Sequence, residues 1–377
     1  MDGGRYGGAR AAAPRVAEHF AKHIAAARRD VNKTIAFAPD APTLEAIIDA
    51  AFWASLRREE GYTPTISLAY LPPEQAGRPV LFERPIPLQP ASLAKVAPAV
   101  ERAGIHLGVW ERQGELAVWG TTRTIPVSCF VLEVNAPGLL VVKHHRGEES
   151  GKYVNVAVLE GDHLKMIDER ASSLPDCPPL LSSLLGFDAP ASWAQSLNVL
   201  VQLAASMRAH RRGGALLVVP SGSEAWRASI VQPILYAIRP FFSELADLMS
   251  HPAADRHHWQ EALSRAVDVI AGLTAVDGAT IITDRYELLA FGTKIARRDG
   301  CPRVESVTMT EPIEGSVATT INPTELGGTR HLSAAQFVHD QRDSVALVAS
   351  QDGHFTVFAW SPCEGAVHAH RVETLLL

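Results

Sequence analysis

Residues 210–220 read HRRGGALLVVP, and the stretch within them that decides the fold is 215–219. This stretch is entirely apolar, so a strand formed here has no polar face to turn toward water. Strands that are buried on both faces lie in the middle of a sheet covered by helices. A helical pattern over 193–210 precedes the strand, and two glycines form the turn between them. The stretch predicts a helix–turn–strand unit at the centre of an α/β domain.

Two internal similarities extend this pattern along the chain. Residues 200–219 and 266–283 both read as a helix, a Gly-Ala pair and an apolar strand. Residues 91–120 and 332–360 both read as a helix followed by two strands that a glycine turn connects. Any α/β protein reuses such units, so two interpretations are open. Either the similarities are generic, or the N-terminal part is a diverged relative of the C-terminal domain.

The first half of the chain reads as helices followed by short strands. Apolar residues at helical spacing predict helices over 16–29, 44–56 and 91–102, whereas the Gly- and Ala-rich residues that open the chain are expected to fray. In the second half a helix is predicted over 259–273. The predicted strands are TISLAYL (65–71), PVLFERP (79–85), IHLGVWE (105–111), ELAVWG (115–120), CFVLEV (129–134), LLVVKHH (139–145) and YVNVAVLE (153–160).

The remaining patterns predict two domains. Ser221 and Glu224 are spaced as a capping box that opens a long helical stretch, which two prolines must kink or divide. A Pro- and Ser-rich strip near 172–190 is expected to be irregular. We therefore expect an α/β (mixed α+β) protein. Its N-terminal mixed domain spans 1–250, and its second domain, a central mixed sheet flanked by helices, spans 251–377.

Composition excludes several classes of protein. The 377 residues are 47% hydrophobic, which is enough for sizeable cores. The 35 Lys and Arg against 41 Asp and Glu give a net charge of −6, which argues against bulk nucleic-acid binding. The cysteines lie far apart, the opening residues lack a signal-peptide pattern, and no apolar run is long enough to span a membrane. These features favour a cytoplasmic protein.

The first of two motifs in the C-terminal third is Asp277-Gly278-Ala279. It stands at the mouth of a predicted strand, where a carboxylate beside two small residues can hold a metal ion close to the backbone. The alternative interpretation is a polar residue that starts a strand beside a glycine turn.

The second motif is Gly-Gly-Thr-Arg-His at 327–331, which precedes a helix predicted over 333–340 with Ser333 as its possible cap. Glycines allow the backbone to approach a ligand, and the N–H groups of a first helical turn point toward an anion. Arg330 can bind phosphate oxygens in bidentate fashion, and Thr329 adds a hydroxyl donor. The composition fits a triphosphate site, although the Walker A pattern is absent. A capped turn with Arg330 in solvent is the alternative.

Both motifs, in this order, resemble the diadenylate cyclase (DAC) domain. That family has an Asp-Gly-Ala motif on a strand and a Gly-Thr-Arg-His-Arg motif at a helix start, and residues 259–360 resemble it in order, spacing and flanking elements. The stretches FWASLRREEG (52–61) and RRGGALLVVPSGSEAWRASI (211–230) look like DACNV, a sensor module that accompanies divergent DAC domains.

The resemblance implies a reaction and roles for particular residues. DAC domains condense two ATP molecules into cyclic di-AMP and release two pyrophosphates, with Mg²⁺ or Mn²⁺ bound and two domains face to face in a homo-oligomer. The N-terminal module would regulate the enzyme through an unidentified sensor ligand. Carried over by position, the catalytic residues are Asp277, which supports the metal and the attacking hydroxyl, Arg330 and His331, and the nucleotide-binding residues are Gly278, Ala279, Gly328, Thr329, Ser333 and Ser350.

The sequence departs from the family pattern at two positions. Leu332 replaces the second arginine of Arg-His-Arg, and Gln351 replaces the usual glutamate. A lost guanidinium removes up to two charge-assisted hydrogen bonds of roughly 1.5–3 kcal/mol each. A degenerate domain that binds nucleotide without turnover is therefore the alternative to a cyclase. Arg297 or Arg298 could supply the missing charge.

Other polar groups give weaker signals. The histidine pairs at 144–145, 257–258 and 368/370 offer metal ligands but no complete ligand set. Residues 221–223, Ser-Gly-Ser, approach a nucleophile elbow, but helix capping explains them better.

Overall fold

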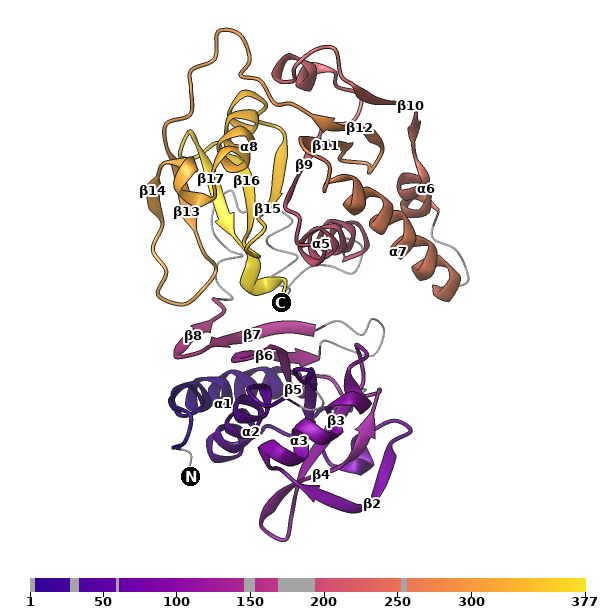
Figure 1. Cartoon of the computed structure of the whole chain (residues 1–377), viewed down its shortest axis with the longest axis vertical. Helices are drawn as coiled ribbons and strands as arrows, with labels where there is room; N and C mark the ends of the chain where they lie inside the picture. The colour runs from indigo at the N-terminus through magenta and orange to yellow at the C-terminus, as the bar shows by residue number, and fades with distance from the viewer. Residues whose placement is uncertain (1–3, 28–33, 59–60, 146–152, 169–193, 252–255) are drawn as a thin grey trace. The chain divides into compact units, whose positions relative to one another are not determined.

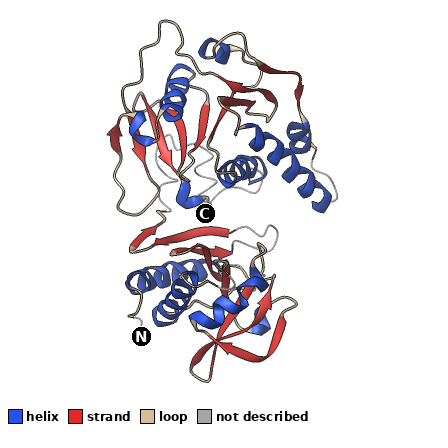
Figure 2. Ribbon diagram, viewed as in Figure 1, coloured by secondary structure: helices blue, strands red, loops and turns tan. Residues whose placement is uncertain are grey.

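The chain forms two units in a computed structural model. The first unit is Met1–Ile167 with Leu377, and the second is Asp168–Leu376. Each contains one mixed sheet flanked by helices (Figures 1 and 2), so the expected mixed α+β class is confirmed. No helix among the described residues has the length and apolar character needed to cross a membrane. The residues that the structure describes are 4–27, 34–58, 61–145, 153–168, 194–251 and 256–377.

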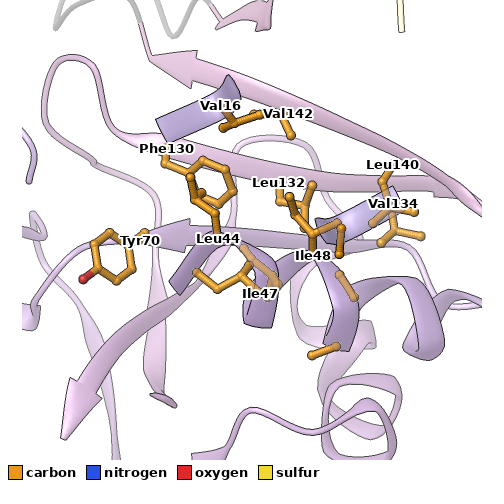
Figure 3. Close-up of a cluster of buried hydrophobic side chains, with 14 of the residues drawn as sticks. Val16, Leu44, Ile47, Ile48, Tyr70, Phe130, Leu132, Val134, Leu140 and Val142 are labelled. Atoms are coloured by element: carbon orange, nitrogen blue, oxygen red, sulfur yellow. The ribbon is translucent and has the colours of Figure 1, made fainter. Parts of the chain in front are cut away.

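Helices α1 (Gly7–Ala27) and α2 (Ala41–Ser55) form the core of the first unit together with its sheet. Val16 of α1 and Leu44 and Ile48 of α2 meet the strands in one apolar cluster (Figure 3). The expectation that the opening residues fray is wrong from Gly7 onward. Ala9, Ala12 and Ala13 are buried in the same cluster, so packing stabilises a helix that begins there.

The first sheet has the strand order β2-β4-β3-β1-β5-β6-β7-β8. Strand β1 runs parallel to β3 and antiparallel to β5, and the other neighbours are antiparallel. All the strands predicted here are present, as is the third helix. The bounds are β1 Ile66–Tyr70, β2 Val80–Pro87, α3 Pro90–Val96, β3 His106–Arg112, β4 Glu115–Thr122, β5 Phe130–Ala136, β6 Leu139–His145, β7 Tyr153–Glu160 and β8 His163–Met166.

The second sheet is built around β9 (Gly214–Val219), every residue of which is buried. Its order is β10-β12-β11-β9-β15-β16-β17-β13-β14, so β9 lies between a parallel neighbour, β11, and an antiparallel one, β15. The prediction of a central buried strand is confirmed. The other strands are β10 Tyr236–Phe242, β11 Ala279–Thr283, β12 Leu288–Thr293, β13 Val307–Thr310, β14 Thr319–Ile321, β15 Val345–Ala349, β16 Phe355–Ser361 and β17 Ala366–Arg371.

Helix α8 (Thr329–Asp340) packs against β15, β16, β17 and β9, with Ala335 and Phe337 in a cluster that includes Leu217 of β9. Alternate residues of a strand face opposite sides of the sheet, so Leu216 faces away from α8. On that side α5 (Ala194–Ala209) and α7 (Arg256–Leu273) pack against each other and the sheet, and α6 (Glu244–Ser250) packs on α7.

The long helix expected after Ser221 is wrong. A short 3-10 turn (Ala225–Ser229) is followed by the extended strand β10 at the edge of the sheet. Two prolines within a few residues prevent a continuous helix, and an edge strand tolerates Pro240 because one side of it needs no ladder hydrogen bond. The chain divides after Ile167 and not at the expected boundary of 250, because β9 pairs with β11 and β10 pairs with β12, which places both strands in the second sheet. The strip at 172–190 lies outside the described residues.

The two sheets repeat one topology. The order β2-β4-β3-β1-β5-β6-β7 in the first unit corresponds, strand by strand and direction by direction, to β10-β12-β11-β9-β15-β16-β17 in the second. This agreement favours the interpretation that the units are diverged relatives. In this correspondence β3 and β4 match β11 and β12. The sequence similarity matched them differently, because it compared residues 91–120 with residues 332–360, which contain β15 and most of α8 and β16.

Asp40 caps α2, and its removal tests the sequence-encoded start of that helix. The Thr43 N–H donates to Asp40 Oδ1 at 2.9 Å, and the hydrogen bonds from Thr43 hold the pKa of Asp40 below its ordinary value. Asp40→Ala should lower the free energy of unfolding at pH 7 by about 1 kcal/mol, measured by urea denaturation. The pKa is depressed in the folded state, so this contribution is present above the ordinary carboxyl pKa and disappears as pH falls through the folded value.

Glu18→Ala is the matched control, because it removes an exposed carboxylate from helix α1 without removing a cap. An equal loss of stability in both variants at pH 7 would contradict the assignment of Asp40 as a cap.

Candidate functional site

The strand register brings both C-terminal motifs to the same end of the central strands of the second sheet. This end, where β9 and β11 begin and β15 ends, is called the sheet edge from here on. Ala279 of β11 pairs with Ala215 of β9, and Ala349 of β15 pairs with Gly214. Asp277 therefore stands just before β11, at the same edge as the residue that follows β15, Ser350. Neighbouring strands lie ~4.8 Å apart, so the two positions are separated by about 10 Å, with the start of β9 between them.

Asp277 is an exposed carboxylate at this edge, with 83% of its side chain accessible. The ammonium of Lys294, which follows β12, donates to Asp277 Oδ2 at 2.6 Å. That hydrogen bond and charge, with a smaller contribution from the Arg330 guanidinium, hold the pKa of Asp277 below its ordinary value. The group is ionised at neutral pH, and the influence of Arg330 places the two motifs within electrostatic reach of each other.

The second motif forms the first turn of α8 rather than a segment that precedes it. The helix begins at Thr329, so the expected start at Ser333 is wrong, and Ser333 lies one turn inside the helix. Gly328 is the N-cap, with φ +80° and no side chain to accept the first N–H groups. Backbone donors and the positive end of the helix dipole are therefore available to an anion at this point.

The guanidinium of Arg330 lies over the start of β9. A Cβ placed on Gly213 would come within 2.8 Å of Arg330 Nη1 and 3.2 Å of the Ala349 carbonyl oxygen. A side chain at this position would displace the guanidinium, and φ of +69° favours glycine here. The turn between α5 and β9 is thus part of the candidate site.

A hollow of about 300 Å³, the α8 hollow, opens between the start of α8 and the β15–β16 turn; its lining is Gly327, Arg330, His331, Ala349, Ser350, Gln351 and Asp352.

His331 lies at the wall of the α8 hollow and is almost fully buried. Its ring packs against the backbone of Gly327 and edge-on to Phe358, and neither ring nitrogen has a hydrogen-bond partner among the described residues. Burial lowers the pKa of His331, so the imidazole is neutral at pH 7. A neutral imidazole can donate or accept a hydrogen bond with a ligand in the α8 hollow, but it supplies no positive charge to that ligand.

Gly278 and Ala279, which the resemblance assigns to nucleotide binding, are packed against other parts of the second unit. A Cβ on Gly278 would lie 2.5 Å from the Gly292 carbonyl carbon, so the space beside it is filled by β12. Ala279 is buried in the core cluster. Both small residues let β11 pack, and Asp277 alone of this motif faces the surface.

Ser350 and Gln351 shape the turn after β15. The Ser350 hydroxyl bonds Asp352 Oδ1 and accepts a hydrogen bond from the His354 N–H at 3.0 Å. Gln351 Nε2 donates to the Arg212 carbonyl oxygen at 3.4 Å. Gln351 therefore ties this turn to the start of β9, a contact that a glutamate carboxylate could not make with a carbonyl.

Sequence reasoning missed Lys294 and the neighbourhood of Arg212. The signals were a lysine directly after the strand that pairs with β11, and two arginines before the glycines of residues 211–214.

Arg297 and Arg298, which the sequence suggested as replacements for the missing arginine, lie away from the motif. Arg298 N–H donates to Asp340 Oδ2, at the C-terminal end of α8, and Ala296 just before Arg297 bonds Ser229. Arg330, in the first turn of α8, lies about 15 Å from that end along the helix axis.

Comparison with known families supports the N-terminal resemblance. Residues 33–123 match the family described as probable sensor domain DACNV. The match includes the stretch 52–61 but ends before 211–230, which the structure places in the second unit. No curated protein matches the chain. The first unit is therefore similar to a sensor domain in the part that contains α2 and the strands β1 to β4.

Gly278 and Gly272 form a matched pair for testing the packing of β11. Gly278→Ala should destabilise the protein by several kcal/mol, because φ of +115° strains any side chain and its Cβ meets the backbone of β12. Gly272→Ala, in helix α7 with open space around it, should raise stability by about 0.5–1 kcal/mol. Thermal unfolding compares the two variants. Similar melting temperatures would show that β11 does not approach β12 in this way.

Proposed function

We propose that the second unit binds ATP at the sheet edge beside α8 and condenses two ATP molecules into cyclic di-AMP. The observation that carries the proposal is the convergence of Asp277, Arg330 and the glycine-capped start of α8 at one edge. A carboxylate, a guanidinium and free helix N–H groups form a set suited to a metal-bound triphosphate. The resemblance of the two motifs to the DAC family supports the same assignment.

Each residue has a distinct task in this proposal. The start of α8 and Arg330 bind the phosphates, and neutral His331 donates or accepts one hydrogen bond at the wall of the α8 hollow. Asp277 orients the attacking 3′-hydroxyl. That hydroxyl gives up its proton to solvent water and forms a bond to the α-phosphorus of the second ATP, and the bond to the pyrophosphate leaving group breaks. Two such steps close the cyclic product, so activity requires two units in a homo-oligomer.

A divalent cation fits the donor set at this edge. The carboxylate of Asp277 is ionised and exposed, and Mg²⁺ or Mn²⁺ is commonly held by one or two carboxylates together with substrate phosphates. Asp277 would hold the ion, with Lys294 giving up its present hydrogen bond. When bound, the ion would neutralise charge on the transferring phosphates.

Nucleotide binding without turnover is the second candidate. Leu332 is half-buried in the first turn of α8, where the family has an arginine, and the amide of Gln351 is engaged by the backbone of Arg212. Both features reduce the charge available to a transition state while leaving the phosphate-binding turn intact. A pure assembly scaffold, by contrast, predicts no ATP binding in calorimetry.

Asp277→Asn tests the cyclase assignment. The change removes a negative charge without changing size, and the side chain is exposed, so the fold should persist. We expect cyclic di-AMP formation from ATP and Mn²⁺, followed by mass spectrometry, to fall at least about 100-fold while ATP affinity changes less than about 10-fold. Asp299→Asn, an exposed carboxylate in a turn, is the control. Undiminished product from the Asp277 variant would refute the assigned role.

Leu332→Arg separates the two candidates. Restoring one guanidinium should raise turnover by about 10–100-fold if the chain is a weakened cyclase, since one charge-assisted hydrogen bond is worth ~1.5–3 kcal/mol. Leu332→Met, which keeps the volume and adds no charge, should leave turnover unchanged. A wild-type chain and an Arg variant that both bind ATP and release no product would favour the binding module.

A further inference from the structure

Three histidines of the first unit meet in space although they are distant in sequence. His19 and His23 lie on α1, and His144 lies on β6. One ring nitrogen from each can be chosen so that all three lie within 4.8 Å of one another. The ring centroids are 4.2 Å apart for His19 and His23, 5.5 Å for His19 and His144, and 5.3 Å for His23 and His144.

Helix and strand periodicity explain why these rings meet. Val16 of α1 faces Val142 of β6 in the core (Figure 3). His19 lies three residues after Val16 on the helix, and His144 lies two residues after Val142 on the same face of the strand. His23 follows His19 by one turn. The histidines therefore continue an apolar contact between α1 and β6 with a cluster of three imidazoles.

The cluster has the chemistry of a transition-metal site. Neutral imidazole is a ligand for Zn²⁺, Co²⁺, Ni²⁺ and Cu²⁺, and two histidines at i and i+4 with a third from another element are a common ligand set. Zinc–nitrogen bonds of about 2.0–2.1 Å place tetrahedral ligand atoms about 3.3 Å apart. The ring nitrogens lie within 4.8 Å of one another, so metal binding would shorten the longest of these separations by up to about 1.5 Å.

The burial of this cluster argues against the simple interpretation that the three histidines are ordinary surface residues in water. His144 is only 5% exposed, and Phe20 packs edge-on against both His19 and His144. An apolar residue at position 144 would continue the core, whereas three imidazoles together repel one another when protonated. A bound dication would give all three rings a common partner and would join α1 to β6.

We propose that His19, His23 and His144 form a binding site for a divalent transition metal, with Zn²⁺ the ion that best suits three imidazoles. The fourth position is open to water or a ligand. The match of residues 33–123 to a probable sensor domain suggests what this site would do: metal occupancy is the signal that the first unit reads.

The test uses the full chain after treatment with a chelator. Titration with Co²⁺, followed by visible absorption, and with Zn²⁺, followed by calorimetry, should reveal one ion per chain at this site. Zn²⁺ should also raise the melting temperature, by an amount that grows with the logarithm of the Zn²⁺ concentration, because it binds the folded state. Asp277→Asn should keep this metal site, so failure of the nucleotide proposal remains distinguishable from failure of the metal proposal.

Two variants and one control decide the outcome. His23→Ala, at a half-buried position, and His144→Asn, which keeps a polar group of similar width, should each weaken Co²⁺ and Zn²⁺ binding at least 10-fold. His163→Ala, an exposed histidine of the same unit, should leave binding unchanged. The proposal is overturned if folded wild-type chain binds neither ion, or if folded His23→Ala retains the wild-type affinity and stoichiometry.

Discussion

The candidate site depends on the burial of β9 between β11 and β15. Because every residue of β9 is buried, the strand can occupy only the middle of the sheet, and its register with both neighbours is fixed by the core. That register aligns Gly214, Ala279 and Ala349 at one edge. A shift of one residue would turn Leu217 out of the cluster with α8 and separate Asp277 from Arg330.

Glycine has three different uses at this edge. At Gly213 it lets the chain pass beneath the Arg330 guanidinium, and at Gly328 it leaves the first turn of α8 without a side-chain acceptor. Gly278 instead allows β11 and β12 to approach each other. The Asp-Gly-Ala motif thus combines one exposed carboxylate with two small residues that allow β11 to pack.

The two units share a topology but differ where the chemistry would lie. In the second unit α8 leads into β15, and its first turn faces the sheet edge. In the first unit β4 is followed by β5 with no helix between them in the described residues. The corresponding turn after β5 is held by α2, since the Gly138 N–H donates to Ser55 Oγ at 3.0 Å. The corresponding turn of the first unit is therefore held by a helix, whereas in the second unit it lines the α8 hollow.

The sequence alone determined most of the elements, the central strand and the identity of the two motifs, because periods of 2 and 3.6 residues are local properties. It also indicated Asp277 and Arg330 as members of one site, although only through a family resemblance. It misplaced the start of α8, which follows Gly328 and not Leu332. It also predicted a helix after Ser221, where pairing of β10 at the edge of the sheet outweighs local propensity. The pairing of Asp277 with Lys294, the closeness of Arg330 to Gly213 and the meeting of His19, His23 and His144 were decided by tertiary structure. Each joins segments whose separation in the chain carries no periodic signal, so only the order and register of the strands could bring them together.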